Sequence, residues 1–130
     1  MKYYYDRYWG IFTMNAPLAQ ITEETFPNLV CGFGYSGQAQ YLNNLLYQAD
    51  HKTGPLPAGT YTITAINNDP HRGQHTCVLT PDPANQMFGR SGFLIHGDTA
   101  DRTHTASDGC IIAPLWVRQQ FEAGDAVEVV

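Results

Sequence analysis

The chain has 130 residues, a length at which proteins form one domain with a sizeable hydrophobic core. Its formal net charge is -5, and its 7 Lys and Arg residues form no cluster. Nucleic-acid binding requires clustered cations that neutralise phosphates, so we expect no nucleic-acid partner. No apolar run approaches the roughly 18 residues of a transmembrane helix, so we expect no membrane span either.

The turn-forming residues favour a β-rich chain. With 12 Gly and 8 Pro, short strands joined by loops are expected in place of long helices. In the first half, the expected elements are, in chain order, a strand within residues 1–14, a strand over 29–36, a short helical turn within 37–53, the turn GPLPAG at 54–59, and the alternating strand TYTITAI at 60–66. Gly32 and Gly34 permit a bend in the second of these strands.

The second half predicts further short strands and one helix. After the loop NNDPHRGQH at 67–75, the expected elements are a strand at 76–80, the strand FLIHG at 93–97, an apolar run that begins within 107–112, a helix over 114–123, and a strand at 126–130 with Glu128 facing outward. Val117 and Phe121 share one face of that helix, and Gly124 suits its C-terminal end. The sum is one β-rich domain over residues 1–130 with one or two short helices.

Cys110 and His96 form the pair with the most reactive chemistry. A thiol is a good nucleophile only as a thiolate, which requires a nearby base or a positive charge. His96 lies at the end of an apolar strand, and Cys110 follows a turn made by Ser107, Asp108 and Gly109. Gly109 allows a sharp turn that aims backbone N–H groups at a developing oxyanion, and the Ser107 hydroxyl can hold that turn.

The sequences around these two residues resemble a known family. FLIHGD at 93–98 followed by ASDGCII at 106–112 resembles the His-Gly … Ser-x-Gly-Cys signature of the L,D-transpeptidase catalytic domain. The stretches 54–61, 114–123 and 124–129 resemble, in order, its turn into a core strand, its closing helix and its final strand. The resemblance covers residues 29–130, leaves 1–28 unplaced, and implies a β-sandwich with the cysteine in a groove.

One subgroup of that superfamily fits best. GYSGQAQYLNN at 34–44 followed by GPLPAGTY resembles the L,D-transpeptidase-like effectors of the type VI secretion system, which are antibacterial toxins. The resemblance implies action on peptidoglycan stem peptides in the target-cell periplasm, by cleavage of tetrapeptides or exchange of their terminal D-amino acid. It also implies a cognate immunity protein and a carrier in the secretion apparatus. The N-terminus lacks the apolar segment of a signal peptide, which fits an injected effector.

The resemblance also implies catalytic roles. Cys110 would form a thioester with the substrate, and His96, within hydrogen-bonding reach of its sulfur, would accept and return a proton. The Gly97 carbonyl would hold the His96 tautomer. The N–H groups of Cys110, Gly109 and Asp108 would form the oxyanion hole. We expect no cofactor, no metal ion and a monomer.

The groove is where the family pattern is followed least closely. Its expected residues are Tyr35, Ser36 and Asn44, with His104 at the rim, although each could equally be a turn residue that satisfies local backbone. Asp108 stands where the wider family commonly has His, and Ile112 stands where it often has Arg. The missing Arg removes a carboxylate-binding group, so the sequence leaves the anchoring of the substrate open.

Other functions compete with this one. The chain could be a housekeeping L,D-transpeptidase that lacks its leader, or a non-catalytic wall-binding or immunity-type module with a buried, slowly reacting Cys110. Asp98, Asp101 and Asp108 count against a reactive thiol because nearby carboxylates disfavour a thiolate. A papain-like peptidase is disfavoured because its cysteine usually precedes its histidine.

The remaining cysteines and histidines suggest two further possibilities. His71, His75 and Cys77 are spaced closely enough for zinc, but no second ligand motif accompanies them. Cys31 and Cys77 are either small buried hydrophobic residues or a disulfide pair, and the sequence does not decide between these.

Overall fold

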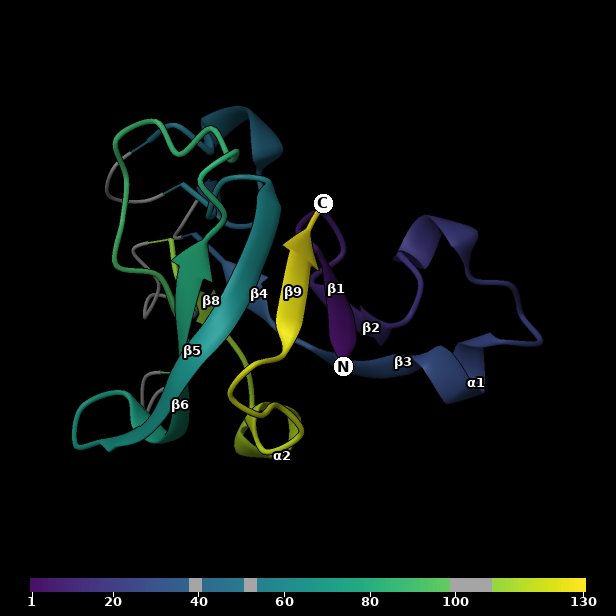
Figure 1. The fold of residues 1–130 in the computed structure, drawn as a ribbon. Helices are drawn as coiled ribbons and strands as arrows, with labels where there is room; N and C mark the ends of the chain where they lie inside the picture. The colour runs from purple at the N-terminus through teal and green to yellow at the C-terminus, as the bar shows by residue number, and fades with distance from the viewer. Residues whose placement is uncertain (38–40, 51–53, 99–108) are drawn as a thin grey trace.

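The computed structural model describes residues 1–37, 41–50, 54–98 and 109–130. These residues form a 9-stranded sheet in the order β3-β2-β1-β9-β5-β6-β7-β8-β4 (Figure 1). The strands are β1 Lys2–Asp6, β2 Ile11–Met14, β3 Val30–Phe33, β4 Tyr35–Ser36, β5 Gly59–Asp69, β6 Gly73–Pro81, β7 Leu94–His96, β8 Ile111–Ile112 and β9 Ala126–Val129. The predicted β-rich class is therefore confirmed.

The helices of the described residues are short. The α-helices are α1 Phe26–Leu29 and α2 Leu115–Arg118, and the 3-10 helices are η1 Leu18–Gln20 and η3 Leu45–Tyr47. The helix predicted over 114–123 is shorter than expected, because the chain turns tightly before β9, where Asp125 Oδ2 accepts a hydrogen bond from the Glu122 N–H at 2.9 Å. None of the helices in the described ranges has the length and apolar character needed to cross a bilayer.

Gly34 joins the two edges of the sheet. β3 and β4 lie at opposite ends of the strand order, yet Gly34 alone separates them in the chain. The sheet must therefore curl until its edges meet, and this one curled sheet provides the layers of the expected sandwich. The predicted bend lies at Gly34, whose N–H donates to the Gly10 carbonyl oxygen at 2.8 Å. A Cβ at this position would collide with the Ile112 carbonyl oxygen.

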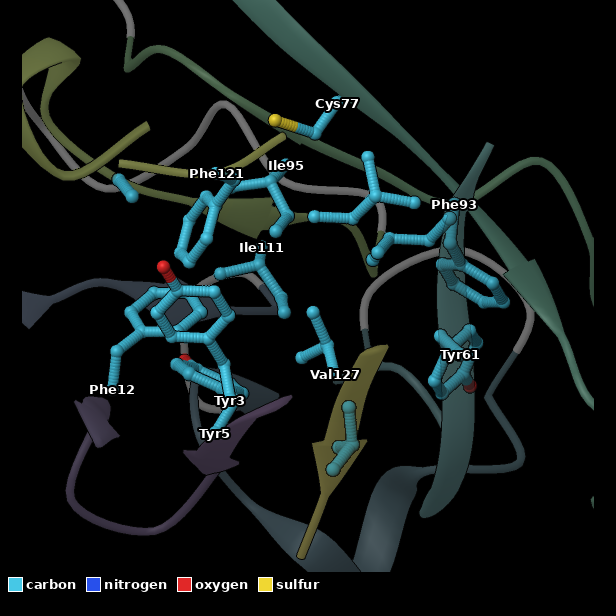
Figure 2. Packing of buried hydrophobic residues seen from close by; sticks show 14 of the residues in the cluster. Tyr3, Tyr5, Phe12, Tyr61, Cys77, Phe93, Ile95, Ile111, Phe121 and Val127 are labelled. Atoms are coloured by element: carbon cyan, nitrogen blue, oxygen red, sulfur yellow. The ribbon is translucent and has the colours of Figure 1, made fainter. Parts of the chain in front are cut away.

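An aromatic core fills the space inside the curled sheet. The rings of Tyr3 and Phe121 meet edge to face, with centroids 4.7 Å apart, and Phe12 packs against Phe121 at 5.3 Å. Figure 2 shows these three rings gathered beside Ile111. Each such side chain stabilises the fold by about 1.5–3 kcal/mol through its burial. Phe121 and Val117 are both buried, although α2 ends at Arg118 and Phe121 lies beyond it.

Residues 1–28, which resemble nothing in the family pattern, contribute two strands to the sheet. β1 pairs in parallel with β9 and antiparallel with β2. Lys2 Nζ lies 3.4 Å from Glu128 Oε2 across the first of these pairings, so Glu128 faces outward as predicted. The single strand expected within residues 1–14 is therefore a hairpin, because Gly10 adopts a left-handed φ of 66° between its arms.

The β5–β6 hairpin is longer than the sequence predicts. Most of the loop expected at 67–75 is paired, with Asn67 opposite Thr76 and Asp69 opposite Gly73. The turn is reduced to residues 70–72 because Asp69 Oδ1 accepts hydrogen bonds from the backbone N–H groups of His71 and Arg72, both at 2.8 Å. The loop prediction was wrong here, and the extended hairpin brings its tip against the end of β7.

Candidate active site

The register of β7 and β8 places His96 beside the end of β8, the strand that follows Cys110. The strands run parallel, with Ile95 beside Ile111 and His96 beside Ile112. Ile95 and Ile111 point into the core and are fully buried. Because side chains alternate along a strand, His96 and Ile112 project from the opposite face. Cys110 lies in the bend that immediately precedes β8.

Along the strand direction, Cys110 lies level with Leu94. Its sulfur accepts a hydrogen bond from the Leu94 N–H at 3.3 Å, and it lies 3.9 Å from the Gly92 carbonyl oxygen. His96 is two residues farther along β7, a step of about 7 Å in an extended strand. His96 and Cys110 are therefore offset along the two strands, and their roles as a catalytic pair stay predictions.

The His96 ring is held in one tautomer. Its Nδ1 lies 2.8 Å from the Gly97 carbonyl oxygen. A carbonyl oxygen only accepts hydrogen bonds, so Nδ1 is the donor and Nε2 is the acceptor of the neutral ring. Burial lowers the pKa of His96, and the nearby cations Arg72 and Arg118 act in the same direction. The ring is therefore neutral at physiological pH and able to accept a proton at Nε2.

A buried serine supports the turn before Cys110. The Ser36 hydroxyl donates to the Gly109 carbonyl oxygen at 2.8 Å and accepts from the Leu56 N–H at 2.9 Å. Ser36 is 0% exposed, so it does not face the groove in which the sequence analysis expected it. That expectation needs correction, because β4 pairs with β8 in a register that turns Ser36 toward the interior.

Arg90 lies beneath the same turn, and the sequence analysis missed it. Its Nη1 donates to the carbonyl oxygens of Gln48 and Pro55, and its Nη2 donates to that of Gly54 at 2.9 Å. The guanidinium carbon is 5.1 Å from the centroid of the Phe93 ring. The motif around Cys110 does not indicate a role for Arg90. The one available signal is the turn GPLPAG, whose backbone carbonyls need hydrogen-bond donors from elsewhere in the chain.

The guanidinium of Arg90 packs against Gly109, in the turn before Cys110. A Cβ on Gly109 would collide with Arg90 Nη2, and Gly109 has a φ of 112°, so only glycine fits this position. Burial lowers the pKa of Arg90, and Cys110 is among the groups that oppose this shift. A buried cation therefore lies within electrostatic range of the thiol.

A groove of about 1100 Å³ opens beyond His96. The described residues that line it include Tyr35, Arg72, Gly97, Ile112 and Trp116. Neither His96 nor Cys110 is among those residues, whereas their neighbours Gly97 and Ile112 are. The groove therefore reaches Gly97, the residue that follows the end of β7.

Of the residues predicted to line the groove, Tyr35 does so and Asn44 is not among the described residues that line it. Tyr35 lines the groove, and its hydroxyl donates to Asp98 Oδ1 at 2.6 Å. Asn44 instead caps η3, where its Oδ1 accepts from the Leu46 N–H at 3.2 Å. Its neighbour Asn43 lines the groove and accepts a hydrogen bond from the Ser36 N–H at 2.9 Å.

Three predicted site residues, His104, Ser107 and Asp108, lie outside the described residues. Their roles therefore stay predictions.

The other cysteines and histidines have structural contacts. Cys31 and Cys77 are free and buried, and burial raises their pKa values to about 11 and about 12. They are therefore unreactive thiols, in contrast to the partly exposed Cys110. His75 Nε2 donates to the Phe121 carbonyl oxygen at 2.8 Å, while His71 is exposed.

A comparison with protein families covers most of the site. The model of the Tlde1 domain matches residues 32–123. The chain belongs to the Tlde1 domain family. This is a family of type VI secretion effectors. No curated protein and no solved structure matches the chain.

The Tlde1 domain match places the site within the family region. It extends from β3 to the turn after α2 and so contains His96, Cys110, Ser36, Arg90 and Arg72. β1, β2 and β9 lie outside the matched range and complete the sheet on the side away from β7 and β8.

Proposed function

We propose that this Tlde1 domain is a cysteine-dependent enzyme that modifies peptidoglycan. Its activity is L,D-carboxypeptidase cleavage of stem tetrapeptides, L,D-transpeptidase exchange of their terminal D-amino acid, or both. The observation that carries the proposal is at β7, where the Gly97 carbonyl orients His96 with Nε2 as the acceptor, two residues along the strand from the Leu94 N–H that contacts the Cys110 sulfur. As an antibacterial effector, the enzyme acts in the target-cell periplasm, and a cognate immunity protein protects the producing cell.

The first step is acylation of Cys110. His96 Nε2 takes the proton from Cys110 Sγ, and the sulfur forms a bond to the carbonyl carbon between the third and fourth stem residues. The carbonyl oxygen becomes an oxyanion, which the backbone N–H groups of Cys110 and Gly109 stabilise. Throughout this step, the Gly97 carbonyl holds Nδ1 protonated so that Nε2 remains the acceptor.

The second step releases the D-amino acid, and hydrolysis or aminolysis of the thioester then regenerates the free Cys110 thiol. The tetrahedral intermediate collapses, the C–N bond breaks, and His96 gives its proton to the departing nitrogen, which leaves a thioester on Cys110. Water attacks the thioester in the carboxypeptidase reaction, whereas the amine of another D-amino acid attacks it in the exchange reaction. In both cases His96 accepts a proton from the attacking group and the sulfur leaves as the thiol.

Three features support Cys110 as the nucleophile. The Leu94 N–H donates to its sulfur, and the Arg90 cation lies within electrostatic range, so both groups favour negative charge on the sulfur. The thiol is partly exposed, unlike those of Cys31 and Cys77. The distance between His96 and Cys110 shortens when substrate binds, since catalytic hydrogen bonds are often long in free enzymes.

The test is the mass analysis of muropeptides after incubation with purified sacculi. The wild-type protein should convert tetrapeptides to tripeptides, or exchange the terminal residue when a D-amino acid is added. Cys110→Ala should reduce this conversion by at least about 1000-fold, since the nucleophile is removed. The matched control is Cys31→Ala, which removes a buried thiol that does not line the groove and should retain the activity.

Two results would contradict the proposal. Turnover by Cys110→Ala at the wild-type rate would exclude Cys110 as the nucleophile. Unchanged muropeptides with the wild-type protein, combined with retention of the protein on sacculi, would instead identify a non-catalytic wall-binding module.

A further inference from the structure

The tip of the β5–β6 hairpin is docked beside the catalytic histidine. The Gly97 N–H donates to the Arg72 carbonyl oxygen at 2.8 Å, which ties the hairpin turn to the residue that follows His96. Asp69 fixes the turn from within through its bonds to the His71 and Arg72 N–H groups. The backbone of Arg72 is therefore held at the end of β7, where the groove begins.

The guanidinium of Arg72 is exposed in the groove. Its side chain is 51% exposed, and its ion pair with Asp69 is long, with 3.9 Å between Nη1 and Oδ2. An exposed pair of that length contributes little free energy and yields readily to another anion. Arg118, also on the groove, is buried, and its three nitrogens donate to the carbonyl oxygens of Gln74 and Ala113. Arg72 is therefore the cation of this pair that can turn to a ligand.

The charge of Arg72 reaches the catalytic histidine. After burial, which is the main cause, Arg72 is one of the cations that lower the pKa of His96. The hydrogen bond from the Gly97 N–H to the Arg72 carbonyl oxygen agrees with this, because Gly97 directly follows His96.

The order of groups along β7 matches the order of atoms in the substrate. Cys110 lies level with Leu94, His96 is two residues farther on, and Gly97 with its partner Arg72 follows. In the proposed reaction the sulfur attacks the carbonyl carbon and His96 protonates the departing nitrogen. The free carboxylate of the departing D-amino acid is attached one carbon atom beyond that nitrogen. A stem peptide laid from Cys110 past His96 would carry this carboxylate toward Arg72.

Among the described residues that line the groove, the arginines are Arg72 and the buried Arg118. Where related catalytic domains often have Arg, this chain has Ile112, which lines the groove without charge. Arginine binds a carboxylate through two parallel N–H···O bonds, so one exposed guanidinium is sufficient for the task.

We propose that Arg72 forms a carboxylate subsite that binds the free C-terminal carboxylate of the departing D-amino acid. This inference rests on the proposed function. It makes the enzyme selective for stem peptides that end at the scissile residue, and it admits free D-amino acids as acceptors through the same contact.

The test compares a tetrapeptide muropeptide that has a free C-terminal carboxylate with the same compound amidated at that carboxylate. For the wild-type protein, kcat/KM should be about 10-fold to 100-fold higher on the acid, the range expected for hydrogen bonds to a charged group. At a pH well above the acid limb, Arg72→Gln should remove this preference by lowering kcat/KM on the acid alone, and Arg72→Lys should retain part of it. The control is Lys2→Gln, an exposed cation on β1 that lies away from the groove, and it should behave as wild type on both compounds.

The possible failures can be told apart. If Arg72→Gln lowers kcat/KM equally on acid and amide, or on neither, the subsite is excluded although the enzymatic function stands. If the wild-type protein cleaves neither compound, the proposed function fails. Calorimetric titration of Cys110→Ala, with and without Arg72→Gln, then decides the subsite. Tighter binding of acid than amide that depends on Arg72 supports it, and equal binding overturns it. The melting temperature should be unchanged in Arg72→Gln, since its backbone contacts remain.

Discussion

The support beneath Cys110 and the groove beside His96 hold their polar side chains in opposite ways. Beneath Cys110, Ser36 and Arg90 are buried and donate to backbone carbonyls that have been removed from water. In the groove, Arg72 is half exposed and has one long ion pair among the described residues, and the Trp116 ring is 53% exposed. Buried polar groups in satisfied networks fix geometry, whereas exposed groups remain available to a ligand.

From this difference we expect some substitutions to affect folding and others to affect substrate binding. A donor lost from the buried support leaves acceptors without partners, and each costs about 1–3 kcal/mol of folding free energy. A side chain lost from the groove costs little stability, because water replaces its contacts. The Arg72→Gln experiment tests a groove residue. The variants below test Arg90 and Ser36, the buried residues that support the Cys110 turn.

The largest stability effect is expected for Arg90→Met. It leaves the carbonyl oxygens of Gln48, Gly54 and Pro55 without their guanidinium donor, and it should lower the free energy of unfolding by about 3 kcal/mol or more. Urea unfolding measures this loss, and Arg72→Gln is the matched control from the groove. A loss below about 1 kcal/mol would mean that the two regions do not differ in the way described.

A smaller effect on stability is expected for Ser36→Ala. The substitution removes the hydroxyl that joins the Gly109 carbonyl to the Leu56 N–H, so unfolding should become easier by about 1–3 kcal/mol. kcat should also fall, since the turn that carries Cys110 loses a support. The control is Thr64→Val, whose hydroxyl bonds Thr80 on the exposed surface and should cost less than about 0.5 kcal/mol. Equal losses in both variants would show that burial does not make the Ser36 contacts special.

The smallest expected effect is on the pH dependence of kcat/KM, through the charge of Arg72 on His96. Burial, Arg72 and Arg118 lower the pKa of His96, while the Gly97 carbonyl and Asp69 raise it. The net lowering keeps His96 neutral to lower pH, so the acid limb of kcat/KM should have its midpoint below about pH 6.5, the ordinary value for histidine. Arg72→Gln removes one of the lowering charges and should move that limb to higher pH. A pH–rate series on the amidated tetrapeptide, which does not use the carboxylate subsite, measures both; an unmoved limb would place Arg72 too far from His96.

Local sequence patterns determined several features of this protein. Alternation predicted the strand at 60–66, and glycine predicted the bend at Gly34. The motif around Cys110 selected one thiol of three, and the structure leaves the other two buried. These features are accessible from sequence because each depends on residues close together in the chain.

Only the tertiary structure decided how the candidate site is supported and what faces the substrate. Ser36 meets Gly109 across 73 positions of sequence, and Arg90 meets Gln48 across 42. The hairpin tip reaches Gly97 only because β5 and β6 remain paired through most of the predicted loop. Such contacts arise when a curled sheet removes polar groups from water and each must find a partner, a requirement that acts in space and not along the chain.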